Sequence, residues 1–364
     1  MRIIEVRVDT VQVPFRVPVE GGRQRFEYRR AGLLSLQTDT GHAGVGEFSA
    51  PERADLGEDA SPRLVQTLQG IHMADPVAVE GALRDIDAWP FVGRAARAAT
   101  ESALVELLAR ASGRSVASFL GPVPAASVAV NALLGVGRPG ETAERAVKLV
   151  ADGFACLKLK AGDEPVDELV ARVRAVREAV GQTVALRVDF NGSLAVKVAG
   201  GVLQRLAAFD LEYVEQPIAA AAGWEALAHL RWTGAVPLAA DESVRDVGAA
   251  RALLDAGAVD SLVVKPARVG GLRQAGAIID LATAAAVPVT LSTLFETGVG
   301  LAGALHLAAI APGPQAHGLA TADLLQSDLL MSPLTVSEGR MALPEGPGLG
   351  IRLDADAIER YRVA

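Results

Sequence analysis

Charged residues recur along the second half of the chain at a nearly constant spacing. The repeating set is Lys160, Asp189, Glu215, Asp241 and Lys265. Successive members are 29, 26, 26 and 24 residues apart, and each closes a short apolar run. Lys158 lies two residues before the first member, and Ser292 and Thr293 close the next run. One interval has the length of a strand plus a helix, so these side chains are expected at equivalent ends of successive strands.

The three acids of this set are candidate metal ligands. Asp189, Glu215 and Asp241 would converge if those strand ends meet at one edge. Three carboxylates cannot share a small volume unless a cation or protons offset their repulsion. The ligands would all be oxygen atoms, with no Cys or His close by. That donor set favours a hard cation, Mg²⁺ with Mn²⁺ as a substitute, and disfavours zinc.

The lysines of the set are candidate acid/base groups. Of 35 Lys and Arg residues only five are lysines, and three of the five are Lys158, Lys160 and Lys265. Lysine can lose its proton whereas arginine cannot, and a nearby divalent cation lowers the pKa of a lysine. A metal on a carboxylate and a neutral lysine beside the adjacent carbon predict removal of an α-proton through an ene-diolate. The simpler interpretation is that Lys158 and Lys160 only form ion pairs with Asp189 and Glu215.

Other polar residues are weaker candidates for contacts with a substrate. Asn131 lies in the first apolar run and faces the same edge. Asn191 follows the third run, but it also opens an Asn-Gly pair that is typical of a turn. Glu242 is either a site residue or a surface residue. The five histidines, including His317, and the single cysteine, Cys156, are interpreted as structural.

The elements that must position these residues are short apolar runs between alanine-rich helices. The runs are 128–134, 155–159, 184–189, 211–215, 236–240, 261–264, 287–291 and 316–319. This alternation predicts parallel strands covered by helices. Eight units predict a (β/α)₈ barrel of the TIM type, whose active site lies at the carboxyl ends of the strands. An open doubly wound sheet is the alternative, but no glycine-rich phosphate turn follows the first run.

The first third of the chain has a different pattern. Residues 1 to about 50 alternate apolar and polar side chains and predict strands, with a hairpin turn at Thr38 to Gly41. Residues 60–120 predict helices. We therefore expect an α+β domain over 1–124, followed by the barrel over 125–339. The segment Pro18 to Arg30 is expected to be a polar loop that is either solvated or binds an anionic substrate; its arginines are Arg23, Arg25, Arg29 and Arg30.

Composition limits the partners of this 364-residue chain. A net charge of −8 and 4% aromatic residues argue against nucleic acid or an anionic membrane as a partner. A single cysteine excludes an internal disulfide and fits a reducing cytoplasm. No uncharged apolar run reaches the ~20 residues that a membrane helix needs. The expected partner is a small carboxylate substrate, and the oligomeric state, a homo-oligomer included, is open.

The combined motifs resemble the enolase superfamily and, within it, the muconate-lactonizing-enzyme subgroup. They are Lys158-Leu159-Lys160, Asp189-Phe190-Asn191, Glu215-Gln216-Pro217, Asp241-Glu242-Ser243, Lys265 with Gly270-Gly271, and Pro347-Gly348-Leu349-Gly350. The resemblance implies a modified barrel with an α+β N-terminal capping domain, which residues 340–364 complete. It implies one Mg²⁺ on Asp189, Glu215 and Asp241. It also implies Lys160 and Lys265 as the acid/base pair, with Lys158 supporting Lys160 and the metal site.

Two further segments bear on the reaction. Residues 292–300, which include Ser292, Thr293 and Glu296, and residues 317–321 are similar to o-succinylbenzoate synthases of menaquinone biosynthesis. That likeness implies dehydration of a cyclohexadiene carboxylate, with Lys160 moving the proton and Lys265 remaining cationic. Dipeptide epimerases typically carry Asp-x-Asp after the eighth strand, which residues 321–325 lack. The alternatives are racemisation or epimerisation of N-acyl amino acids or dipeptides, muconate-type cycloisomerisation, and a binding protein with an idle site.

Overall fold

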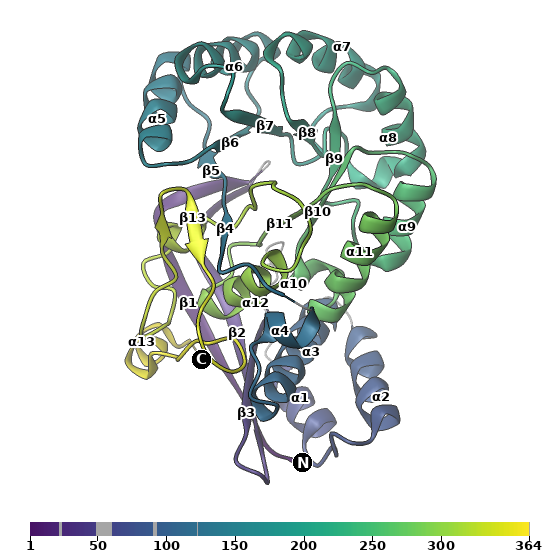
Figure 1. The fold of residues 1–364 in the computed structure, drawn as a ribbon, viewed down its shortest axis with the longest axis vertical. Helices are drawn as coiled ribbons and strands as arrows, with labels where there is room; N and C mark the ends of the chain where they lie inside the picture. Colours follow the sequence, from purple (N-terminus) through teal and green to yellow (C-terminus); the bar gives the residue numbers. More distant parts are fainter. Residues whose placement is uncertain (22–23, 49–59, 90–92, 122, 364) are drawn as a thin grey trace.

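The structure, a computed structural model, describes residues 1–21, 24–48, 60–89, 93–121 and 123–363. Two regions are apparent in Figure 1: a ring of short strands with helices outside it, and a long antiparallel sheet with its own helices. Both chain ends lie on the side of the antiparallel sheet. No helix in the described ranges combines the length and the apolar character needed to cross a membrane.

Seven parallel strands form the wall of the barrel. In spatial order they are β5 (Ala132–Leu134), β6 (Cys156–Lys160), β7 (Ala185–Asp189), β8 (Tyr213–Glu215), β9 (Leu238–Ala240), β10 (Ser261–Val264) and β11 (Val289–Leu291). Both faces of these strands are buried, which explains their continuous apolar runs. The register pairs Lys160 with Asp189 and Asp189 with Glu215. The strand-end spacing therefore places these three side chains at one rim, as predicted.

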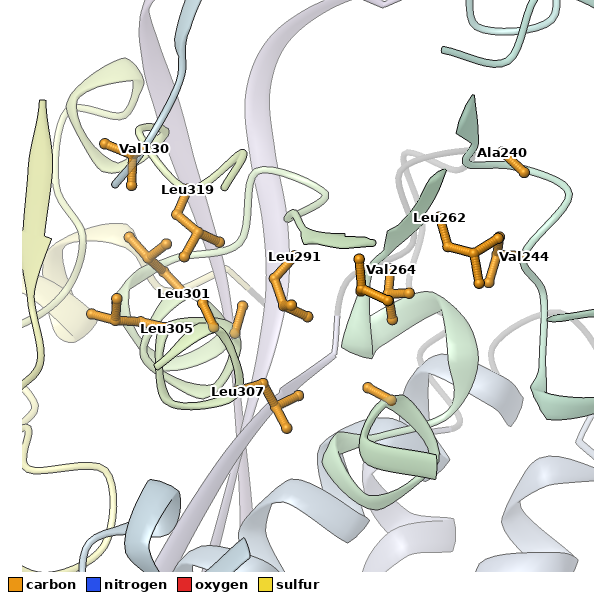
Figure 2. Close-up of a cluster of buried hydrophobic side chains, with 14 of the residues drawn as sticks. Val130, Ala240, Val244, Leu262, Val264, Leu291, Leu301, Leu305, Leu307 and Leu319 are labelled. Atoms are coloured by element: carbon orange, nitrogen blue, oxygen red, sulfur yellow. The ribbon is translucent and has the colours of Figure 1, made fainter. Parts of the chain in front are cut away.

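The connecting helices cover the outside of the strands. They are α5 (Pro139–Ala151), α6 (Val166–Val180), α7 (Val196–Leu206), α8 (Gly223–Trp232), α9 (Val247–Asp255), α10 (Pro266–Val269), α11 (Leu272–Ala284) and α12 (Gly298–Ala308). Short 3₁₀ turns lie at Ala207–Phe209, Ala220–Ala222 and Ala322–Leu324. Figure 2 shows part of the resulting core, in which Leu262 and Val264 of β10, Leu291 of β11 and Leu301 of α12 are all buried.

The barrel closes through a segment shorter than the predicted eighth strand. Residues 316–319 form only isolated parallel bridges, His317 with Val130 and Gly318 with Ser292. The backbone N–H of Asn131 donates a hydrogen bond to the His317 carbonyl oxygen at 2.9 Å. A Cβ added to Gly318 would lie 2.7 Å from Ser292 Oγ, so the two segments cross closely here and a larger residue would displace the Ser292 side chain. The first run also divides, because β4 (Ser127–Ala129) pairs with β13 (Arg340–Ala342) outside the barrel wall.

The N-terminal region is an antiparallel sheet against helices. Its strands are β1 (Ile3–Gly21), β2 (Gln24–Thr38) and β3 (Ala43–Phe48), and its helices are α1 (Ala60–Leu68), α2 (Pro76–Asp87), α3 (Gly93–Ala111) and α4 (Val116–Leu120). The hairpin turn at Thr38 to Gly41 is confirmed. Helix α3 lies against β3 so closely that a Cβ on Gly46 would lie 1.9 Å from the Ala99 carbonyl oxygen.

The prediction of a loop over Pro18 to Arg30 is wrong. Strand β1 continues through Pro18 and β2 begins at Gln24, and the two pair from Val19 with Phe26 to Gly21 with Gln24. Polar composition suggested a loop, but a two-stranded ribbon satisfies its backbone groups between its own strands, even in solvent. The prolines act only locally, since the register shifts between Pro14 and Val19. Arg23 lies outside the described residues.

The C-terminal segment returns to the N-terminal sheet. After β12 (Val336–Ser337) and β13, helix α13 (Ala355–Tyr361) packs beside β1 (Figure 1). The Val363 amide donates to the Thr10 carbonyl at 2.9 Å, and Arg362 forms an ion pair with Asp9. These contacts tie the end of the chain to the edge strand of that sheet.

Candidate active site

A cavity of about 350 Å³ lies at the carboxyl ends of the barrel strands. Its barrel side is lined by polar side chains that include Asn131, Lys158, Lys160, Asn191, Glu242, Lys265, Arg268, Ser292 and Thr293. Its other side comes from the β1–β2 hairpin through Phe15, Phe26, Tyr28 and Arg29. The hairpin therefore covers the barrel mouth and contributes a mostly aromatic surface.

Lys158 and Lys160 project from β6 toward the carboxylates of the next two strands. Lys158 Nζ lies 3.1 Å from Asp189 Oδ2 and 3.1 Å from Glu215 Oε1. Lys160 Nζ lies 2.6 Å from Asp189 Oδ2 and 2.8 Å from Asn191 Oδ1. The alternation of side chains along a strand places both lysines on the interior face, because they are two residues apart.

A second ion-pair group lies on the far side of the barrel. Lys265, directly after β10, has its Nζ 2.5 Å from Asp241 Oδ2. Arg268 Nη1 donates to the other oxygen, Asp241 Oδ1, at 2.8 Å. Strands β7, β8 and β9 lie between β6 and β10. The lysines of the set thus approach the cavity from opposite walls.

Arg268 is a residue that the spacing argument missed. It lies on α10, three residues after Lys265, where one helical turn brings it back to the rim. A basic residue at that offset from a strand-end lysine is the signal that could have identified it. Phe15, Phe26 and Tyr28 were missed for another reason. The segment Pro18 to Arg30 was considered for substrate binding only through its arginines, of which Arg29 lines the cavity.

The acidic residues of the set are fully buried and differ in their electrostatic environment. Burial and the Asp189 carboxylate together raise the pKa of Glu215 to about 7. Burial also opposes the ionisation of Asp241, but Lys265 and Arg268 outweigh it and hold the pKa of that carboxyl below its usual value. For Lys158, burial lowers the pKa, and Glu215 and Asp189 more than offset that effect and raise it well above its usual value.

These residues fit a hard divalent cation by chemistry rather than by a preformed cage. In the described ranges, no three His, Cys, Asp or Glu side chains are already gathered around one point. Lys158 instead lies between Asp189 and Glu215, and Lys265 holds Asp241. The donors are nevertheless three buried carboxylates from adjacent strands, one of them costly to ionise without a positive charge nearby. An oxygen-only donor set of this kind suits Mg²⁺.

The weaker sequence candidates divide into two groups. The first group lines the cavity and consists of Asn131, Asn191, Glu242, Ser292 and Thr293. Within it, the side-chain nitrogen of Asn191 donates a hydrogen bond to Glu242 Oε1 at 3.1 Å.

Glu296 belongs to the second group, because the structure places it outside that lining. It is 3% exposed and packs in a smaller pocket with Glu47. Its carboxylate accepts a hydrogen bond from the Leu294 amide. Glu296 therefore shapes the loop after β11 from behind the cavity.

The residues interpreted as structural have structural environments. His317 is buried, and its Nδ1 accepts a hydrogen bond from the Leu291 amide at 3.0 Å. Burial lowers the pKa of His317 to about 4, so its ring is neutral near pH 7. Cys156 is a buried free thiol, and burial raises its pKa to about 12. Neither residue lines the main cavity.

Two family models match complementary parts of the chain. The N-terminal domain of the mandelate racemase/muconate lactonizing enzyme family matches residues 3–121, and an enolase C-terminal domain-like model matches residues 141–357. The chain belongs to the muconate-lactonizing-enzyme subgroup of the enolase superfamily. The long sheet with its helices is thus the N-terminal domain of this family, and the barrel is its enolase-like domain.

Relatives in this subgroup catalyse different reactions. Muconate cycloisomerase 1 of Rhodococcus opacus is 30% identical over 99% of this chain and 98% of its own length. o-Succinylbenzoate synthase of Thermobifida fusca is 40% identical, over 58% of this chain and 65% of its own length. A dipeptide epimerase of Enterococcus faecalis, solved with Mg and the dipeptide L-Leu-L-Tyr, is 27% identical with a TM-score of 0.87, covering 96% of this chain and 99% of that one. This enolase-superfamily enzyme therefore has lyases and isomerases among its relatives.

Proposed function

We propose that this enzyme removes the proton α to a carboxylate and thereby dehydrates a cyclohexadiene carboxylate to o-succinylbenzoate. The observation that carries the proposal is the pair of buried lysine clusters on opposite walls of one cavity. Lys160 contacts Asp189 and Lys265 contacts Asp241, and both lysines line the cavity. The match at 40% identity to an o-succinylbenzoate synthase supports this reaction among those of the subgroup.

Asp189, Glu215 and Asp241 would hold one Mg²⁺. The bound ion would supply positive charge next to the substrate carboxylate, where negative charge develops as the α-proton leaves. Glu242 follows Asp241 in the sequence and accepts a hydrogen bond from the Asn191 side chain, so it supports the rim from the cavity side. A cation held by these carboxylates would replace part of the ion pairing that Lys158 supplies to Asp189 and Glu215.

Lys160 would act as the base and then as the acid. Its Nζ takes the α-proton, which leaves an electron pair on the substrate as the ene-diolate. That pair forms the new carbon–carbon double bond while the carbon–oxygen bond to the neighbouring hydroxyl breaks. Lys160 returns its proton to the departing oxygen, so water is the leaving group and the elimination is syn. Lys265, held by Asp241 on the opposite wall, remains cationic and stabilises the intermediate.

A racemase or epimerase activity is the second candidate, and the symmetry of the lysines favours it. Lys160 and Lys265 approach from opposite walls, so each could serve one face of an α-carbon. For this activity, N-acyl amino acids are the first expected substrates and dipeptides are the second. Muconate-type cycloisomerisation is the third, supported by the full-length match at 30% identity.

A substrate panel with Mg²⁺ tests these candidates together. Purified enzyme is supplied with the succinyl cyclohexadiene carboxylate, N-succinyl amino acids of both hands, and cis,cis-muconate. We expect formation of o-succinylbenzoate. Absence of that product, with racemisation or lactonisation instead, would replace the first candidate by one of the others.

Deuterium exchange at the α-carbon separates lyase from racemase chemistry. In ²H₂O, Lys160→Ala should abolish dehydration. For racemisation, Lys160→Ala and Lys265→Ala should each stop exchange from only one enantiomer. Loss of exchange from both enantiomers in either variant would contradict the one-lysine-per-face scheme.

A further inference from the structure

Arg187 lies inside the barrel, is 0% exposed, and has no role in the proposed reaction. It lies on β7, two residues before Asp189, so both side chains point into the barrel and Arg187 occupies the layer beneath the rim. Arg187 Nε donates to Glu212 Oε2 at 2.6 Å. Its guanidinium carbon lies 4.6 Å from the centre of the Tyr213 ring. These contacts fix the guanidinium in one place.

The same guanidinium reaches a residue of the cavity wall. Arg187 Nη1 donates to Asn131 Oδ1 at 3.1 Å and to the Ala316 carbonyl at 2.8 Å. A guanidinium has five N–H donors and no acceptor. The side-chain amide of Asn131 must therefore turn its oxygen toward Arg187.

The orientation of Asn131 determines what it offers to a ligand. With its oxygen held by Arg187, its NH₂ group is left as the free end of the amide. The side chain lines the cavity, and its nitrogen makes no hydrogen bond to another described residue. Asn131 is joined to the barrel beside β5, whereas the three rim carboxylates come from β7, β8 and β9. Its NH₂ therefore suits an oxygen of the substrate away from the rim carboxylates.

We infer that Arg187 is a positioning residue that holds the Asn131 amide so that its NH₂ binds a carbonyl or carboxylate oxygen of the substrate. This inference rests on the proposed function, because it concerns the same cavity. Asn131 would be the residue in contact with substrate, and Arg187 would act only through it. The oxygen bound is a second one, distinct from the carboxylate next to the carbon that loses its proton.

Asn131→Asp is the sharpest single variant. It preserves the shape of the side chain but offers only oxygen atoms, so Arg187 keeps an acceptor while the cavity loses its donor. We expect KM to rise about ten-fold or more with kcat nearly unchanged, because a hydrogen bond made equally in ground and transition states is lost. Asn131→Ala should behave similarly.

A double-mutant cycle tests whether Arg187 acts through Asn131. Arg187→Met should raise KM in the wild-type background and leave it nearly unchanged in the Asn131→Ala background. Arg177→Met is the matched control. Arg177 is a buried arginine that donates to the Phe209 and Val184 carbonyls at the other end of the strands. Its loss should lower Tm without changing KM.

The outcomes separate this inference from the proposed function. Equal KM values for wild type and Asn131→Asp, or additive effects in the cycle, would overturn the inference while the reaction stands. If Arg187→Met does not fold, the Asn131 variants still test whether Asn131 contacts the substrate. Their affinity for o-succinylbenzoate is then compared with that of wild type by calorimetry in the presence of Mg²⁺. Wild type that neither turns over the panel nor binds this product would overturn both proposals.

Discussion

Glu47 of the N-terminal sheet caps helix α12 of the barrel through Thr297. Glu47 Oε1 accepts a hydrogen bond from the backbone amide of Thr297 at 2.8 Å. Glu47 Oε2 accepts two more, from the Thr297 hydroxyl at 2.7 Å and from the backbone amide of Gly300 at 2.9 Å. A carboxylate at a helix N-terminus satisfies orphan amides and faces the positive end of the helix dipole. The cap comes from 250 residues away along the chain. It joins the two regions directly behind the cavity.

Loss of this cap should destabilise the folded protein. Glu47→Ala leaves three buried donors without their acceptor, so we expect a loss of about 2 kcal/mol in the free energy of unfolding. Urea denaturation followed by circular dichroism measures it through the midpoint. Glu144→Ala, an exposed glutamate on α5, is the control and should leave the midpoint unchanged. A Glu47→Ala midpoint equal to that of wild type would show that the cap contributes no net stability.

Mg²⁺ should stabilise the protein through the rim carboxylates. A ligand that binds only the folded state adds about 2.7 kcal/mol at one hundred times its dissociation constant. We therefore expect Tm to rise with MgCl₂, and Glu215→Gln to remove most of that rise. Glu178→Gln, an exposed substitution on α6, should retain it. A wild-type Tm that does not respond to MgCl₂ or MnCl₂ would argue for the idle-site alternative.

Buried histidines should make the fold sensitive to mild acid. His306 Nδ1 accepts a hydrogen bond from the Ala117 backbone amide at 3.1 Å. Its Nε2 is hydrogen-bonded to the Leu349 carbonyl oxygen. Burial lowers the pKa of His306 from 6.5 to about 4. Between those values the unfolded chain binds a proton that the folded protein does not, so stability falls as pH falls through this window.

The expected loss for His306 is about 2 kcal/mol at pH 5 relative to pH 7.5. His306→Asn keeps an acceptor for Ala117 and removes the titrating ring, so its stability should depend less steeply on pH. Unfolding free energies at the two pH values measure the difference. His229→Gln, an exposed histidine on α8, should match wild type. An unchanged pH dependence in His306→Asn would contradict the assignment.

The rim of lysines and carboxylates could be found in the sequence because it is periodic. Each strand of a parallel barrel ends at the same edge, so one residue per unit appears there at a regular interval. Lys160, Asp189 and Glu215 are indeed register partners on adjacent strands. Local alternation and turn residues likewise predicted the hairpin at Thr38 to Gly41.

Tertiary contacts decided the placement of the β1–β2 hairpin over the cavity and of the residues that pack behind the cavity. Phe26 and Tyr28 lie on a ribbon that looked like a polar loop, because pairing between β1 and β2 needs no buried apolar pattern. Glu296 sits next to a cavity-lining segment in sequence yet faces Glu47 instead. Neither placement leaves a local signal.

The sequence by itself determined which chemistry is available: three carboxylates and three lysines at one barrel rim. Only the tertiary structure decided how they are held, with Arg268 on Asp241 and Arg187 on Asn131. The physical reason is the range of the interactions. Strand and helix periods are local and repeat along the chain, whereas hydrogen bonds and ion pairs depend on which segments, often far apart in sequence, pack within about 3 Å of one another.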